Sequence, residues 1–120
     1  MIHYKNNWLS VNIATYAENK TTALFLETED GERYSVISVN LSNYSECLPR
    51  DCIFVPLYKS EDLIALLVEE KILNPLTLPD VQQGYGTYRP YLIDLKQVDD
   101  FKGVTKEEIY RSIESICSLD

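Results

Sequence analysis

Three consecutive runs of alternating apolar and polar residues near the start of the chain constrain its fold most. They span Trp8 to Tyr16, Thr21 to Glu29 and Arg33 to Leu41. Such alternation predicts strands with one buried face, because successive side chains of a strand point to opposite faces. In the first run the predicted inward residues are Leu9, Val11 and Ile13, and the predicted outward ones are Trp8, Ser10 and Asn12. Asp30-Gly31 separates the last two runs and predicts a type I′ hairpin turn.

The rest of the chain predicts further strands and two helices. Residues 42–52 are polar and predict a loop. A short strand is predicted after it, and because Pro56 has no N–H to donate, this strand must lie at a sheet edge or end at the proline. A helix is predicted from Ser60 until Asn74-Pro75 stops it, and a last strand from Thr87 to Leu95. A capping box at Thr105–Glu108 predicts the C-terminal helix. We therefore expect a single α+β domain over residues 1–120, an antiparallel sheet of about four or five strands with two helices packed on one face.

The charge of the chain excludes some functions. Lys and Arg number 11 against 19 Asp and Glu, a formal net charge of −8. Nucleic acids and anionic lipids are bound mostly by clustered Lys and Arg, so we expect neither direct nucleic-acid binding nor membrane binding. An acidic balance suits a basic protein surface instead. The chain has no apolar run suited to a signal peptide or membrane span, and its 3 cysteines are an odd number, so we expect a cytoplasmic protein.

Catalytic patterns are sparse, and we predict that the protein is not an enzyme. The single histidine, His3, lies beside a terminus expected to fray, which disfavours a Ser-His or Cys-His pair. Gly84-x-Gly86 precedes a strand pattern, whereas a phosphate loop precedes a helix. Asp94, in an otherwise apolar strand end, is the residue around which a small-molecule enzyme would need a pocket.

The cysteines suggest a structural metal site. Cys47 and Cys52 have four residues between them, a spacing compatible with two ligands of a tetrahedral zinc ion. Cys117 and His3 are the candidates for the remaining ligands if folding brings them together. The alternative is that the cysteines are free thiols, since Cys117 falls on an apolar helix stripe and Cys52 begins an apolar strand.

Two groups of residues are candidates for binding a partner. The first is acidic and crowds the first hairpin: Glu27, Glu29, Asp30 and Glu32. These carboxylates predict either a patch that docks on a basic groove or a solvated turn that keeps a sheet end from pairing with other chains. The second group is Tyr85, Tyr88, Arg89 and Tyr91, residue types enriched at protein-binding hot spots. In a strand, Tyr85 and Tyr91 share one face and Tyr88 takes the other; the alternative is half-buried tyrosines that finish a sheet.

Two segments carry a resemblance. Residues 30–41, DGERYSVISVNL, and residues 84–95, GYGTYRPYLIDL, resemble a family of small bacterial proteins of unknown function carried on mobile elements. The resemblance covers roughly Trp8 to Leu95, and the Cys47 to Cys52 segment departs from the family pattern. In size, charge and lack of catalytic residues the chain is also similar to phage anti-CRISPR proteins. These likenesses imply an inhibitor that disables a host defence protein.

The expected function is therefore a non-enzymatic, acidic protein-binding module. Its partner would be a host protein with a basic, nucleic-acid-binding surface, such as Cas9, from which it would exclude nucleic acid. The alternative is a small structural or accessory protein with a zinc-stapled loop and no inhibitory role.

Overall fold

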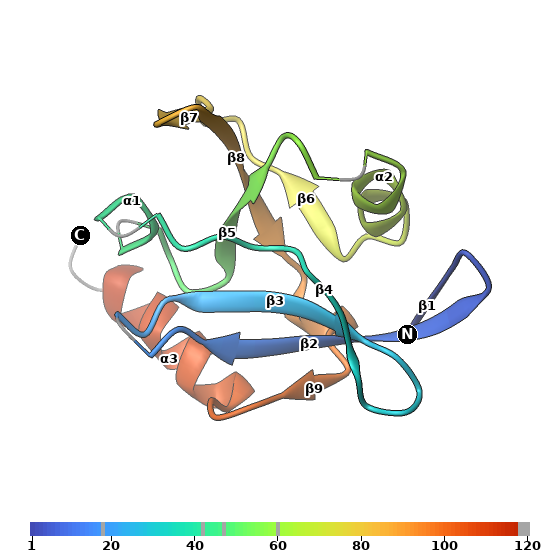
Figure 1. Ribbon diagram of the computed structural model, residues 1–120. Coiled ribbons are helices and arrows are strands. Elements are labelled where there is room, and N and C mark those ends of the chain that lie inside the picture. The colour runs from blue at the N-terminus through green and yellow to red at the C-terminus, as the bar shows by residue number, and fades with distance from the viewer. Residues whose placement is uncertain (18, 42, 47, 60, 118–120) are drawn as a thin grey trace.

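The computed structural model describes residues 1–17, 19–41, 43–46, 48–59 and 61–117; for residues 43, 46 and 112–117 only the backbone is described. It confirms the predicted α+β class. The strands form two sheets, one with five strands and one with four. Figure 1 shows these sheets one above the other, with α2 beside the upper sheet and α3 beside the lower one.

The first sheet contains the predicted N-terminal strands. Its strands, in the order β1-β2-β3-β4 with β9 also beside β2, are β1 (Ile2–Tyr4), β2 (Asn7–Thr15), β3 (Thr22–Glu27), β4 (Arg33–Val36) and β9 (Asp100–Phe101). Neighbours along this order are antiparallel, whereas β9 runs parallel to β2. Leu9, Val11 and Ile13 are fully buried, as the alternation predicts. The predicted third strand ends early, and Ile37 then donates a backbone hydrogen bond to Leu24.

The turn between β3 and β4 differs from the prediction. A type I′ turn needs positive φ at both central residues, but Gly31 has positive φ and Asp30 does not. Gly31 N–H donates to the Thr28 carbonyl, and Thr28 N–H donates to the Glu32 carbonyl, so the hairpin loop holds three residues. One glycine in the left-handed region is all that such a loop requires.

The residues before Trp8, for which no strand was predicted, form one arm of another hairpin. Tyr4 pairs with Asn7 in the β1–β2 ladder, and the two residues between them, Lys5 and Asn6, have φ of 46° and 66°. Positive φ at both central positions is the type I′ geometry. Ile2 and Tyr4 are buried, which holds this arm on the core.

The second sheet is built around one long strand. It contains β5 (Cys52–Pro56), β6 (Leu73–Pro75), β7 (Val81–Gln83) and β8 (Gly86–Ile93), and β8 pairs antiparallel with the other three. Pro56 ends β5, and β5 lies at the edge of its sheet, as predicted. The predicted loop over residues 42–52 contains a short helix, α1 (Asn43–Glu46).

The first predicted helix is α2 (Glu61–Glu69), and it stops before Asn74-Pro75. Lys71 adopts a left-handed conformation, with φ of 62°, and donates to the Val68 carbonyl, while Ile72 N–H donates to the Leu67 carbonyl. This pair of hydrogen bonds is a Schellman motif, which closes a helix. The chain is thereby released early enough for Leu73–Pro75 to pair with β8 as β6.

The C-terminal helix follows its prediction, whereas the two short elements before it were not predicted. A short 3-10 helix, η1 (Leu95–Gln97), leads to β9, and α3 (Lys106–Cys117) follows. Glu108 N–H donates to Thr105 Oγ1 at 3.1 Å, so Thr105 is the N-cap that the capping box predicts.

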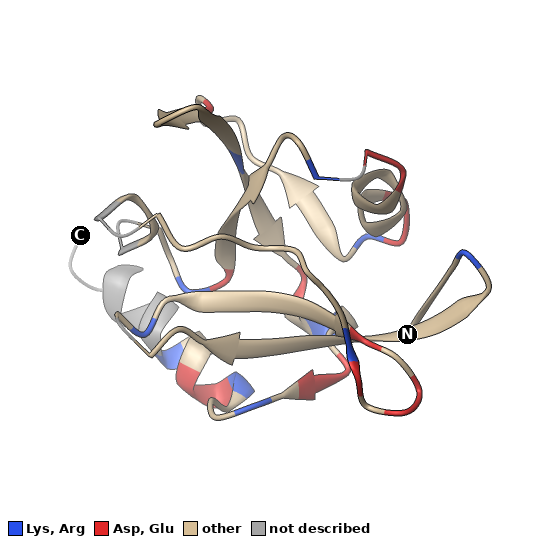
Figure 2. Ribbon diagram, in the orientation of Figure 1, with Lys and Arg blue, Asp and Glu red and all other residues tan. Residues whose placement is uncertain are grey.

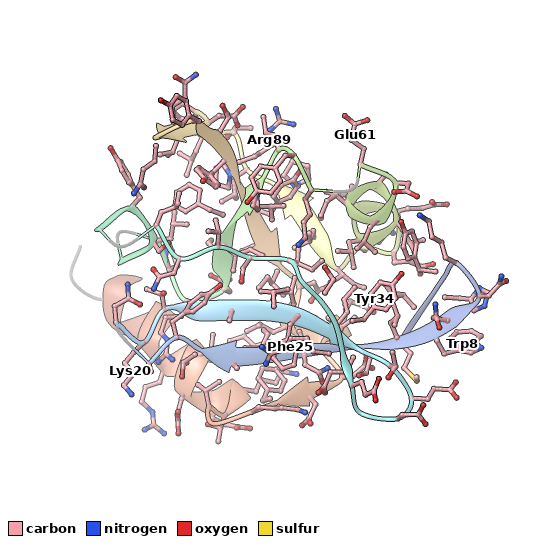
Figure 3. All side chains as sticks on the ribbon, in the orientation of Figure 1. Trp8, Lys20, Phe25, Tyr34, Glu61 and Arg89 are labelled. Carbon is pink, nitrogen blue, oxygen red and sulfur yellow. The ribbon has the colours of Figure 1, made fainter. Side chains whose placement is uncertain are left out.

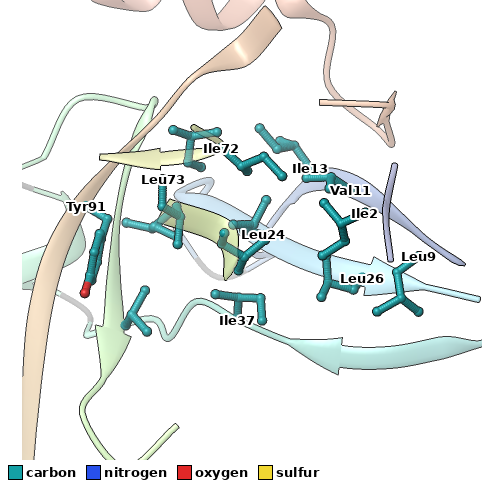
Figure 4. Close-up of a cluster of buried hydrophobic side chains, with 14 of the residues drawn as sticks. Ile2, Leu9, Val11, Ile13, Leu24, Leu26, Ile37, Ile72, Leu73 and Tyr91 are labelled. Atoms are coloured by element: carbon teal, nitrogen blue, oxygen red, sulfur yellow. The ribbon is translucent and has the colours of Figure 1, made fainter. Parts of the chain in front are cut away.

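Both sheets share one hydrophobic core. Figure 4 shows Leu73 of the second sheet near Leu24 of the first, and Tyr91 of β8 and Ile37, the residue after β4, belong to the same cluster. Ile109 of α3 is fully buried in the same cluster. Burial of this apolar surface holds the two sheets together and fixes which loops lie at each end.

Candidate functional site

The acidic hairpin divides into one structural residue and three exposed ones. Glu27 has a side chain only 15% exposed; it pairs with Lys102 at 2.7 Å and accepts a hydrogen bond from Asn12 at 3.1 Å. Glu29, Asp30 and Glu32 are exposed at the end of the hairpin and enter no ion pair among the described residues. Figure 2 shows these acidic positions along the loop that joins β3 to β4. Three of the four predicted acidic residues are thus exposed to solvent.

Trp8 lies beside this loop. It is 52% exposed, and together with Asn6, Asn7, Thr28, Glu29 and Asp30 it lines a hollow of about 300 Å³. The His3 ring contacts the Trp8 ring, with centroids 4.9 Å apart. Figure 3 shows Trp8 at the end of the first sheet where β1 meets β2. We call the surface formed by Trp8, Glu29, Asp30 and Glu32 the hairpin face.

The hairpin face has the chemistry to hold a cation. An indole ring attracts a Lys or Arg side chain through the negative face of its π-system, and the attraction grows when carboxylates are nearby. Trp is also the residue type most often found as a binding hot spot. Trp8 was not among the site residues predicted from the sequence, although the alternation in β2 already placed it on the outward side, opposite Leu9.

The four residues of the tyrosine group do not form one surface. Tyr85 is fully exposed in the turn between β7 and β8, so the predicted face shared with Tyr91 does not exist. The Tyr88 ring covers Gly86, where an added Cβ would lie 2.7 Å from its Cζ. Arg89 is held by Asp80 through two hydrogen bonds of 3.1 and 3.2 Å, and Tyr91 is 6% exposed.

The tyrosine group also lies far from the acidic hairpin. Figure 1 places the β7–β8 turn at the top left of the molecule and the β3–β4 loop at the lower right. One compact patch of partner protein therefore cannot cover both. The two predicted groups are separate candidate surfaces.

A larger hollow lies between α2 and the second sheet. It has a volume of about 610 Å³, and Arg89 and Tyr91 line it together with Ile64, Ala65 and Val68 of α2. We call it the α2 groove. Hydrogen bonding and charge from Asp80 raise the pKa of Arg89, so this guanidinium is charged at neutral pH.

Two of the four predicted zinc ligands lie outside the part of the chain that the structure describes. Cys47 lies outside the described residues, as does the side chain of Cys117. Figure 1 places β1, which carries His3, and the last turn of α3 at opposite ends of the molecule. Among the described residues, no three His, Cys, Asp or Glu side chains gather closely enough to hold a metal ion.

The described thiol, Cys52, is held in its protonated form. It is half-buried, and its Sγ donates to Asp51 Oδ1 at 3.7 Å. Burial, with a further contribution from the Asp51 charge, raises the pKa of Cys52 to about 12. Burial also raises the pKa of Asp51. A zinc ligand must be a thiolate, so a metal at Cys52 would have to overcome this environment.

Asp94 serves the local backbone. Its carboxylate accepts a hydrogen bond from Lys96 N–H at 3.0 Å and caps η1. This capping role accounts for an acidic residue at the end of an apolar strand.

Comparison with known proteins gives no relative. No protein-family model matches the chain, and no curated protein or solved structure matches it either. Within the described ranges, every helix is too short or too polar to cross a bilayer.

Proposed function

We propose that this protein is a non-enzymatic binding module whose hairpin face docks on a basic surface of a nucleic-acid-handling protein. The observation that carries the proposal is the half-exposed Trp8 beside the exposed carboxylates of Glu29 and Asp30. If Trp8 served only the hydrophobic core, its ring would be buried. If the acidic turn served only to stay solvated, no aromatic ring would be needed beside it. Together they suit a Lys or Arg side chain from a partner.

The mechanism is competition for a basic surface. Glu29, Asp30 and Glu32 take the place of nucleic-acid phosphates against partner Lys and Arg side chains, and the net charge of −8 attracts such a surface over a distance. A cation placed over Trp8 fixes the register of the complex. Nucleic acid is then excluded by both charge and volume.

The biological role that we propose is inhibition of a host defence effector in the cytoplasm, with Cas9 as a concrete candidate. The inhibitor would be encoded by a phage or another mobile element. Support comes from the acidic charge and from the hairpin face.

The first test identifies the partner. The tagged protein is used to capture proteins from a bacterial lysate at low and then moderate salt, with mass spectrometry as the readout. We expect one stoichiometric partner that handles nucleic acid and is released as salt rises. The purified partner is then titrated with the protein in the presence and absence of its own nucleic acid, which we expect to compete. Simultaneous binding of both would contradict the mechanism.

Matched variants test the surface. The triple variant E29Q/D30N/E32Q should weaken binding to the partner by about tenfold, and Trp8→Ala by roughly thirtyfold, the size of a hot-spot loss. The control, E61Q/E69Q/E70Q, removes the same charge from exposed positions of α2 and the residue after it. If the control weakened binding as much as the hairpin variant, net charge rather than the hairpin face would be responsible.

A further inference from the structure

A small polar pocket opens beside the turn that joins β2 to β3. It has a volume of about 300 Å³, and its walls come from residues 19–22, from α1, from residues 48–50 and from the first residues of β5. Figure 1 shows α1 and the β2–β3 turn at the same end of the molecule. We call this space the Arg50 pocket, and its polar lining includes Lys20, Thr21, Thr22, Ser45, Arg50 and Cys52.

The charged side chains that line the Arg50 pocket are cationic. They are Lys20 and Arg50, and no Asp or Glu is among the described residues of the lining. Neither cation enters an ion pair within the part of the chain that the structure describes. Asp51 does not line the pocket, and it accepts a hydrogen bond from the protonated thiol of Cys52. The pocket is therefore a local positive site in a chain whose net charge is −8.

Arg50 also carries an unsatisfied donor. Its Nε is buried and has no hydrogen-bond partner among the described residues. A buried N–H that has lost water and gained no acceptor is costly, and the cost is greater when the group is charged. Because this side chain lines the pocket, an acceptor bound there would satisfy the donor. An anion is the best acceptor, since hydrogen bonds between ionised groups are stronger than neutral ones.

Hydrogen bonds hold the walls of the pocket together. The hydroxyl of Thr22 donates to the carbonyl of Arg50, which fixes the start of β3 against the loop that carries Arg50. Lys20 lies two residues before Thr22, so the two cations come from segments that touch. On α1, Ser45 Oγ accepts a hydrogen bond from Leu41 N–H at 2.7 Å, which leaves the Ser45 proton to be donated. Donors from separate segments thus share one small space.

We propose that the Arg50 pocket binds a phosphate group, either as inorganic phosphate or as a small phosphate monoester. The phosphate oxygens accept hydrogen bonds from Arg50 and Ser45, and the exposed ammonium of Lys20 supplies a second positive charge. Two cations match a phosphate dianion, and donors from separate segments suit a tetrahedral group better than a planar carboxylate. The volume is at the lower end of the range of ligand pockets, roughly 300–1,000 Å³, so the ligand is small.

Inorganic phosphate is the first probe. The full chain, labelled with nitrogen-15, is titrated with phosphate at constant ionic strength and slightly alkaline pH, and backbone amide shifts are followed by NMR. We expect saturable shifts at residues 19–22, 45 and 50–53. Acetate should bind about tenfold more weakly, because it is planar and carries one charge. Equal binding of acetate and phosphate would overturn the assignment of phosphate.

A parallel titration with glycerol 3-phosphate separates the two sources of the phosphate group. Tighter binding than that of inorganic phosphate would identify a monoester as the ligand, and weaker binding would identify free phosphate. Either result supports a phosphate site. Absence of saturable shifts with both compounds would remove the pocket as an anion site and leave water as its occupant.

Two variants with matched controls locate the site. Arg50→Gln should weaken phosphate binding by about tenfold, whereas Arg33→Gln, the same change at an exposed position of β4, should leave it intact. Lys20→Gln should weaken binding by about threefold, since its ammonium is exposed and screened, and Lys96→Gln in η1 should not. Lys20→Gln also serves if Arg50→Gln fails to fold. Unchanged binding in either folded variant would overturn the proposal.

The Arg50 pocket is independent of the hairpin face. Figure 3 shows Lys20 and Trp8 at opposite ends of the first sheet. The hairpin variant E29Q/D30N/E32Q should bind phosphate as the parent chain does, and Arg50→Gln should still bind the protein partner. Failure of one proposal therefore leaves the other standing.

Discussion

The hydroxyl of Tyr4 donates a hydrogen bond of 2.9 Å to Asp62 Oδ2. Tyr4 lies on β1 in the first sheet, and Asp62 lies in the first turn of α2, which packs beside β6 of the second. The bond therefore ties the hairpin that presents Trp8 to the helix that walls the α2 groove. Both candidate surfaces depend on elements that this contact holds in place.

Removing this hydroxyl should cost stability. Tyr4→Phe removes the hydrogen bond that the buried Tyr4 donates to the carboxylate of the exposed residue Asp62, and we expect a loss of about 1 kcal/mol in the free energy of unfolding. Urea denaturation followed by circular dichroism measures it. Tyr58→Phe, at a ring 77% exposed, is the matched control and should change stability little. Equal effects of the two substitutions would show that the bond contributes nothing.

The end of α2 offers a stabilising substitution. Lys71 holds a positive φ of 62° that favours glycine, so Lys71→Gly should raise the free energy of unfolding by about 0.5–1 kcal/mol. Lys71→Ala, which removes the charge and keeps the strained backbone, should give no such gain. Thermal denaturation of the parent chain and the two variants tests this prediction. A gain in stability in Lys71→Ala would show that loss of the lysine charge, and not relief of the backbone strain, is responsible.

The acidic residues of the first hairpin should respond unequally to neutralisation. Glu27→Gln weakens contacts to Lys102 and Asn12 at a side chain only 15% exposed, and should cost roughly 1 kcal/mol. Glu29→Gln, at an exposed position without an ion pair among the described residues, should stay within about 0.5 kcal/mol of the parent chain. Chemical denaturation of both variants tests this division. If Glu27→Gln left the free energy of unfolding unchanged, Glu27 would have no structural role and would belong with the exposed carboxylates of the hairpin.

The Cys52 thiol should react slowly and only at high pH. Its pKa is raised to about 12, so at pH ~9, where an ordinary thiol is about half ionised, on the order of one Cys52 in a thousand is thiolate. In a chain carrying Cys47→Ser and Cys117→Ser, the rate of alkylation should rise with pH up to about 12. Fast alkylation near neutral pH in the folded chain, matching the rate in urea, would contradict this environment.

The sequence predicts the longer elements well because their burial is local and periodic. The alternation of Leu9, Val11 and Ile13 with polar residues predicts β2, and the capping box that begins at Thr105 predicts α3. The short strands β1, β6, β7 and β9 have too few residues to show a period. Tertiary pairing with a neighbour defines them, and a single sequence does not display that.

The candidate surfaces were predictable only in part. Exposure of Glu29, Asp30 and Glu32 follows from their place in a turn. The approach of Trp8 to that turn depends on pairing between strands, and the α2 groove depends on how α2 settles on β5 and β8. The end of α2 was not predictable, because Lys71 adopts the left-handed conformation that glycine usually adopts at the end of a helix. A lysine at this position does not indicate such a conformation.

The strand β9 imposes an order on folding. It pairs with β2 across almost ninety positions of sequence, through Asn12 with Asp100 and Ile13 with Phe101. During synthesis, the edge of β2 that pairs with β9 stays unpaired until the second sheet and α2 have left the ribosome. Such late closure slows folding, since the loop entropy is lost before the contact is gained. A nascent chain stalled before residue 100 would therefore present an open strand edge that could pair with another chain.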